Sequence, residues 1–121
     1  MRFELKYGPS YTMLVAYLEP GEYVTAEAGA MSYMSPSIEA RTRMREGFLG
    51  SLGISIIGRQ SFFVNDYIAR DGPGELGLVS APIGDMDRLE VKPSRGYIIQ
   101  KASYVASTQR VNLDVQWQGF T

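Results

Sequence analysis

The stretch from Gly47 to Ala69, GFLGSLGISIIGRQSFFVNDYIA, decides the fold. Its first part is an apolar run interrupted by glycines, and its second part, Ser61–Ala69, is a strand pattern that is apolar on both faces. Such a strand needs cover on both sides, so we expect it at the centre of a β-sandwich or against another subunit. The run before it is compatible with a loop or with one short helix within residues 48–57, although each internal glycine costs a helix about 1 kcal/mol relative to alanine.

Segments on either side of this stretch alternate between apolar and polar residues, which predicts short strands separated by turns. We expect strands at 3–7, 38–45, 76–80, 86–91, 97–106 and 111–117, and a hairpin over 13–27 that turns at Glu19-Pro20-Gly21-Glu22. About nine or ten short strands in one chain are typical of an all-β fold. The sequence therefore predicts a single antiparallel β-sandwich domain over residues 1–121.

The composition argues against several kinds of chemistry. The 121 residues include no cysteine and no histidine, so the chain has no thiolate nucleophile, no imidazole base and few good transition-metal ligands. The net charge is −1, which provides no overall field for holding nucleic acid or an anionic membrane. We therefore expect a protein that is not an enzyme, with no catalytic residues, no cofactor and no metal site.

Two patterns bear on location. The N-terminal residues MRFELKYGPS lack the apolar core of a signal peptide. The longest nearly uncharged stretch, Gly47–Gly58, is shorter than the roughly 20 residues that a membrane-spanning helix needs. From these patterns we expect a cytoplasmic protein.

The expected strand at 38–45 carries three arginines on one face, at Arg41, Arg43 and Arg45. Such a row is a candidate nucleic-acid contact, because arginines spaced along a strand can reach successive phosphates. Glu39 and Glu46 partly neutralise the row, so a solvated strand face is the favoured interpretation.

Two other polar groups have a structural explanation that outweighs a functional one. Asp85, Asp87 and Glu90 form an acidic cluster that lacks the full pattern of a calcium loop, which indicates an exposed turn. Asn65 and Asp66 lie inside the central strand, where we expect them to be satisfied by internal hydrogen bonds.

A homo-oligomer is the expected assembly, because the glycine-rich run concentrates large apolar residues that a soluble monomer would not expose. Closed symmetry then favours a ring, such as a trimer, or a dimer. The residues expected at the oligomer interface are Phe48, Leu49, Leu52, Ile54, Ile56, Ile57, Trp117 and Phe120.

Five blocks carry a resemblance over nearly the whole chain: Thr25–Met31, Gly47–Gly53, Gly58–Phe63, Ala81–Asp85 and Trp117–Phe120. In this order they resemble the prokaryotic relatives of the altered-inheritance-of-mitochondria protein twenty-four. The resemblance implies the β-sandwich of the trp RNA-binding attenuation protein-like superfamily. It also implies tandem domains that form trimers, with this chain similar to the first domain only. It implies no agreed enzymatic reaction, and in mitochondrial relatives a role in inner-membrane organisation.

Three hypotheses about function follow. The leading one is a non-catalytic, oligomer-forming protein with a structural or scaffold role. The second is a nucleic-acid-binding ring that uses Arg41, Arg43 and Arg45. The third is a module that binds a small molecule or lipid, or contacts a membrane peripherally, through the apolar residues 48–57. The sequence identifies no ligand for this module.

Overall fold

The computed structural model describes residues 1–45, 53–57, 62–80, 84–91, 97–100, 103–108 and 112–116. For residues 43–45, 53–57, 62, 97–100 and 112–116 it describes the backbone alone. The described residues form eleven strands and no α-helix, which confirms the all-β prediction.

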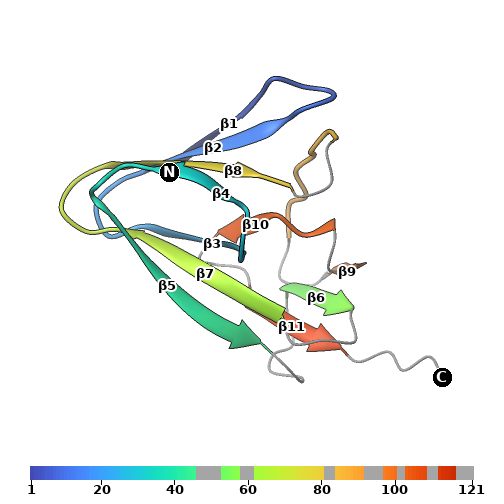
Figure 1. Ribbon diagram of the computed structural model, residues 1–121. Helices are drawn as coiled ribbons and strands as arrows, with labels where there is room; N and C mark the ends of the chain where they lie inside the picture. Colours follow the sequence, from blue (N-terminus) through green and yellow to red (C-terminus); the bar gives the residue numbers. More distant parts are fainter. Residues whose placement is uncertain are drawn as a thin grey trace.

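Two four-stranded antiparallel sheets face each other as a sandwich (Figure 1). The first sheet has the order β1 (Arg2–Lys6), β2 (Met13–Leu18), β8 (Gly74–Val79), β4 (Met31–Met34). The second sheet has the order β10 (Ala106–Thr108), β3 (Tyr23–Glu27), β7 (Phe62–Ala69), β5 (Ile38–Arg45). The bounds of β5 are those predicted from its alternating pattern.

A third sheet is parallel, which the sequence pattern did not predict. It has the order β11 (Asn112–Gln116), β6 (Gly53–Ile57), β9 (Tyr97–Gln100), and both of its pairings are parallel. Parallel neighbours need long connections, and here β7 and β8 lie between β6 and β9 in the chain. Because residues 53–57 form β6, the short helix considered within 48–57 does not extend over them. Residues 48–52 lie outside the described residues.

The turn at residues 19–22 was predicted correctly, but the hairpin around it was not. The Glu22 N–H donates to the Glu19 carbonyl oxygen over 3.0 Å, and Gly21 takes a φ of 89°, as a type II turn requires at this position. However, β2 pairs with β1 and β8, whereas β3 pairs with β10 and β7. The turn therefore carries the chain from one sheet to the other.

At the same end of the sandwich, two further segments connect the sheets: residues 35–37 join β4 to β5, and residues 70–73 join β7 to β8 (Figure 1). Backbone hydrogen bonds join them, since the Arg70 N–H donates to the Ser37 carbonyl oxygen over 2.8 Å. The Ser35 N–H donates to the Glu75 carbonyl oxygen over 2.9 Å. Three sheet-to-sheet connections thus close this end of the molecule.

The main core lies between the two antiparallel sheets. The first sheet contributes Ala16, Leu18, Leu76 and Leu78, and the second contributes Val24, Ala26, Ile38, Tyr67 and Ala69. On β7, Tyr67 and Ala69 face this core. Val64 points to the opposite face of the strand, because side chains alternate along it, and Val64 is also fully buried. Cover on both sides of the central strand is therefore confirmed at these positions.

The strand expected at 86–91 does not form in the single chain. Residues 84–91 have no regular secondary structure, and most of their side chains are exposed. The Thr12 N–H donates to the Gly84 carbonyl oxygen over 3.1 Å, which holds the start of this segment beside the β1–β2 loop. An alternating pattern is not sufficient for a strand, because a strand also needs a neighbour with which to pair.

Candidate interaction surfaces

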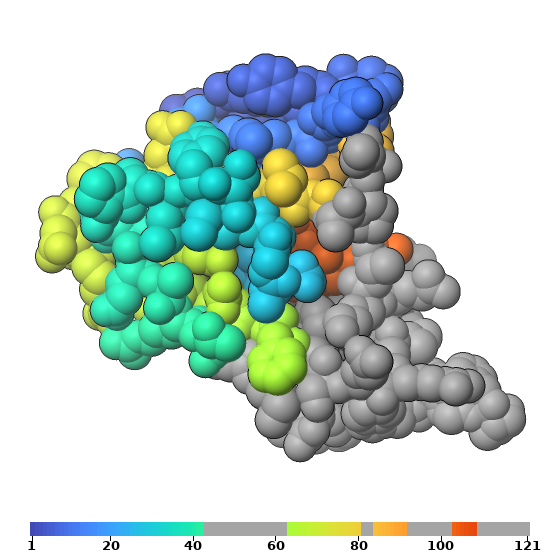
Figure 2. Space-filling view, in the orientation of Figure 1, coloured from blue at the N-terminus to red at the C-terminus, as the bar shows by residue number. Residues whose placement is uncertain are grey.

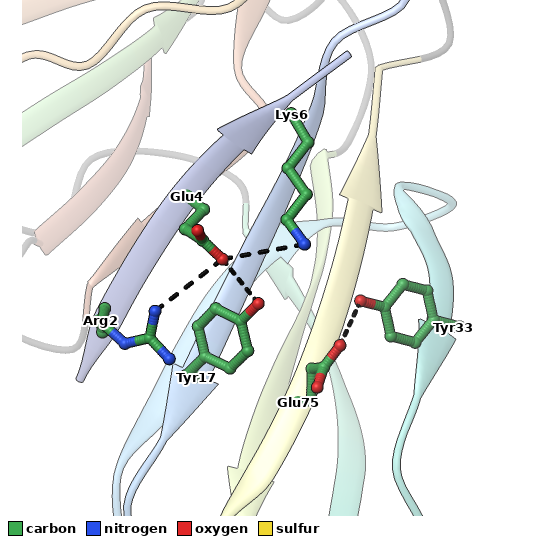
Figure 3. Close-up of polar contacts among 6 residues, drawn as sticks. All are labelled: Arg2, Glu4, Lys6, Tyr17, Tyr33 and Glu75. Carbon is green, nitrogen blue, oxygen red and sulfur yellow. Dashed lines mark hydrogen bonds and ion pairs between the residues drawn. The ribbon is translucent and has the colours of Figure 1, made fainter.

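The outer face of the first sheet carries two hydrogen-bonded tyrosine–carboxylate pairs, and we call it the tyrosine face (Figure 3). The Tyr17 hydroxyl donates to Glu4 Oε1 over 2.6 Å, and the Tyr33 hydroxyl donates to Glu75 Oε2 over 2.7 Å. The six residues of the tyrosine face are Arg2, Glu4, Lys6, Tyr17, Tyr33 and Glu75.

Glu4 is the centre of the first pair. Its Oε1 lies 3.8 Å from both Arg2 Nη1 and Lys6 Nζ, and the Arg2 guanidinium lies 4.0 Å from the centroid of the Tyr17 ring. These cross-strand contacts join β1 to β2 on the solvent side of the sheet. The exposed ion pairs contribute little individually, so the Tyr17 hydroxyl is the main partner of Glu4.

These contacts shift several pKa values. The Tyr17 hydroxyl lowers the pKa of Glu4, and Glu4 in turn raises the pKa of Tyr17. The charge of ionised Tyr17, followed by that of Glu4, raises the pKa of Lys6. The hydrogen bond to Glu75 raises the pKa of Tyr33 to about 12. Both tyrosines are therefore protonated hydrogen-bond donors at neutral pH, which makes them unsuitable as general bases.

The position of Tyr33 depends on a glycine in the neighbouring strand. Tyr33 pairs with Gly77 of β8, and a Cβ at Gly77 would overlap the Tyr33 ring. The ring therefore lies directly over the glycine backbone, from where its hydroxyl reaches Glu75. The sequence reasoning missed this face, because it depends on cross-strand register. The only local signal was the alternating charge of Arg2, Glu4 and Lys6.

The arginine strand presents a partly neutralised surface. Arg41 on β5 donates through Nε to Glu39 Oε1 over 3.1 Å, and Arg70 Nη2 lies 3.2 Å from the same oxygen. The Arg41 contact lowers the pKa of Glu39. The structure places Arg43 and Arg45 two and four residues further along β5, and their side chains lie outside the described residues.

The expected oligomer interface falls mostly outside the described part of the chain. Phe48, Leu49, Leu52, Trp117 and Phe120 lie outside the described residues. The backbone at Ile54, Ile56 and Ile57 belongs to β6, the middle strand of the parallel sheet.

Two exposed apolar side chains lie at the β3–β4 corner, Met31 and Phe63, and we call them the corner patch. Their exposed fractions are 37% and 47%. The Ala28 N–H of the corner donates to the Phe63 carbonyl oxygen over 3.0 Å, which places Phe63 beside the segment that leads into β4. In Figure 2 the first described residues of β7 lie on the near face, next to the residues of this corner. The corner patch thus places two exposed apolar side chains beside the β3–β4 connection.

The polar residues of the central strand are satisfied internally, as expected. The Thr42 hydroxyl donates to Asn65 Oδ1 over 2.8 Å, and Asn65 Nδ2 donates to the Tyr67 hydroxyl over 2.9 Å. The Thr25 hydroxyl donates to Asp66 Oδ1 over 2.6 Å. These hydrogen bonds account for the polar residues within the strand, so no binding site is needed to explain them.

The acidic residues of 84–91 form an exposed segment. Asp85 accepts hydrogen bonds from the Thr12 hydroxyl over 2.6 Å and from the Met86 N–H over 2.9 Å, and the Thr12 bond lowers its pKa. Among the described residues, no group of three or more acidic side chains is arranged to hold a metal ion. No helix in the described part of the chain has the length and apolar character that crossing a membrane requires.

Comparison with known proteins adds one finding. Residues 3–121 match the model of a family described as Mitochondrial biogenesis AIM24. No curated protein and no solved structure matches the chain.

Proposed function

The chain belongs to the Mitochondrial biogenesis AIM24 family, and from this premise we propose that it is a non-catalytic β-sandwich that self-associates in a structural or scaffold role. The family description refers to mitochondrial biogenesis and names no reaction. The full sequence provides neither histidine nor cysteine for catalysis. In the tyrosine face, the polar groups are hydrogen-bonded or ion-paired to one another rather than aimed at a common point.

The corner patch is the observation that carries the proposed self-association. Phe63 lies on the face of β7 that also carries the buried Tyr67 and Ala69, yet it is 47% exposed. It also lies six residues after Ile57, which ends the apolar run that predicts assembly. Burying an exposed aromatic ring against a second copy removes apolar area from water, which favours association.

Light scattering of the full chain across micromolar concentrations tests this proposal. We expect the wild type to run as an oligomer and Phe63→Asp to have at most half of its mass, because a carboxylate in a buried contact is costly. Leu52→Asp should act in the same direction. Leu5→Asp is the matched control, since Leu5 is a 48% exposed leucine on β1, at the other edge of the first sheet. A monomeric wild type would overturn the proposal.

The alternatives have weaker support. Arg41 is paired with Glu39, which reduces the charge available for phosphate groups. A steep dependence of RNA or DNA binding on salt would nevertheless favour the nucleic-acid alternative. Binding to uncharged liposomes would favour a lipid-binding module.

A further inference from the structure

Among the described strands, β5 is a long edge strand. All eight of its residues pair with β7 in a continuous register, and β5 ends the strand order of the second sheet. In the described residues β11 contacts β5 without pairing with it. Half of the backbone groups of such an edge strand point away from the sheet, where they can pair with another strand.

The charges on this edge favour an acidic partner strand. Glu39, Arg41, Arg43 and Arg45 alternate along β5. If two copies of β5 paired antiparallel about Thr42, Arg41 would lie opposite Arg43 of the second copy, and like charges directly opposite destabilise a sheet. A strand with acidic residues at alternate positions would instead complement the arginines.

The chain itself contains such a segment without a partner strand. A strand was expected at residues 86–91, but residues 84–91 have no regular secondary structure in the single chain. Asp85 and Asp87 are exposed and lie two residues apart, as Arg41 and Arg43 do. In the described part of the chain, an acidic segment that pairs with no strand and a basic strand that has one unpaired edge therefore occur together.

We propose that residues 85–89 of one copy add as an antiparallel strand to the β5 edge of a second copy. The register that places Asp87 opposite Arg41 also places Asp85 opposite Arg43. Asp87 is the main charge contact, because Asp85 also accepts the Thr12 hydroxyl. This inference rests on the proposed self-association and names the segments that meet.

The positions of the two segments fit a head-to-tail assembly. Figure 1 shows β5 and residues 84–91 on opposite sides of the molecule. One copy can therefore donate its acidic segment to a neighbour while its own β5 edge receives a segment from another copy. A heterologous contact of this kind closes into a ring when the rotation between copies allows it.

Charge reversal in the full chain tests the contact. Light scattering across a concentration series should show that Arg41→Glu and Asp87→Arg each weaken association about tenfold, a change of about 1.4 kcal/mol. An equimolar mixture of the two variants should associate more strongly than either variant alone, because every contact between unlike variants brings together either the wild-type charges or the reversed charges, which also attract. The charge-swapped chain that carries both substitutions should recover the wild-type mass for any number of copies, because all of its contacts pair opposite charges. Arg2→Glu, an equal charge change on β1, should leave the mass unchanged.

The outcomes separate this contact from self-association in general. Stronger association on mixing and recovery in the charge-swapped chain support the contact, because a misfolded variant would show neither. An oligomeric wild type whose mass neither variant changes overturns the pairing alone. The pairing is also overturned if both folded variants dissociate and the charge-swapped chain stays dissociated. A wild type that is monomeric overturns the proposed self-association together with this inference.

Discussion

At the scale of single residues, Gly77 and Tyr33 depend on each other. The Tyr33 ring lies where a side chain at Gly77 would be, and this position lets the Tyr33 hydroxyl reach Glu75 over 2.7 Å. Because folding raises the pKa of Tyr33 from 10.0 to about 12, this bond contributes to stability below pH 10. The contribution is lost as the pH rises through about 12.

We therefore predict that Gly77→Ala displaces the Tyr33 ring and lowers the pKa of Tyr33 from about 12 toward 10. An absorbance titration of tyrosinate measures this change, with Tyr33→Phe as the reference that lacks the group. Gly84→Ala is the control, because a Cβ at Gly84 would meet no atom within 4 Å. If Gly77→Ala titrates like the wild type, the glycine does not determine the position of the ring.

At the scale of elements, the hydrogen bond from the Tyr17 hydroxyl to the Glu4 carboxylate joins β2 to β1. Folding lowers the pKa of Glu4 below 4.5, chiefly through the Tyr17 hydroxyl, so its contribution to stability is present above about pH 4.5 and is lost as the pH falls. The arginine and lysine on either side of Glu4 act in the same direction, more weakly.

We predict that Glu4→Gln lowers the free energy of unfolding at pH 7, and that its difference from the wild type shrinks below about pH 4. Urea unfolding at several pH values measures this difference. Glu90→Gln, at an exposed position in residues 84–91, should leave the free energy nearly unchanged at every pH. A deficit that is the same at pH 3 and pH 7 would contradict a role for the Glu4 charge.

At the scale of the whole molecule, stability depends on the packing of the first sheet against the second. Leu76 of β8 is fully buried between them. We predict that Leu76→Ala lowers the free energy of unfolding by about 2–5 kcal/mol, because it removes buried methyl groups and leaves a cavity. Urea unfolding provides the measurement. Leu5→Ala, at a 48% exposed leucine, should cost about 0.5 kcal/mol or less. Equal losses for both variants would show that the sheets do not share a tightly packed core.

The prediction from sequence was most accurate where the information was local. Alternation placed β5 at Ile38–Arg45, and the Pro-Gly pair identified the turn at residues 19–22. The composition alone, with no histidine and no cysteine, argued against an imidazole base and a thiolate nucleophile. The candidate surfaces could not be predicted in the same way, because the tyrosine face joins residues of β1, β2, β4 and β8, and the corner patch joins β4 to β7.

By itself, the sequence determined that the chain is all-β, that Ser61–Ala69 contains a strand covered on both faces, and where several strands begin and end. These properties follow from the two-residue period of a strand and from the backbone preferences of glycine and proline. Only the tertiary structure decided that residues 13–27 cross between sheets, that β6, β9 and β11 pair in parallel, and that residues 86–91 have no strand partner in one chain. The physical reason is that a strand pattern specifies which faces need cover, whereas the choice of neighbour depends on the competition among all the strands for the same edges.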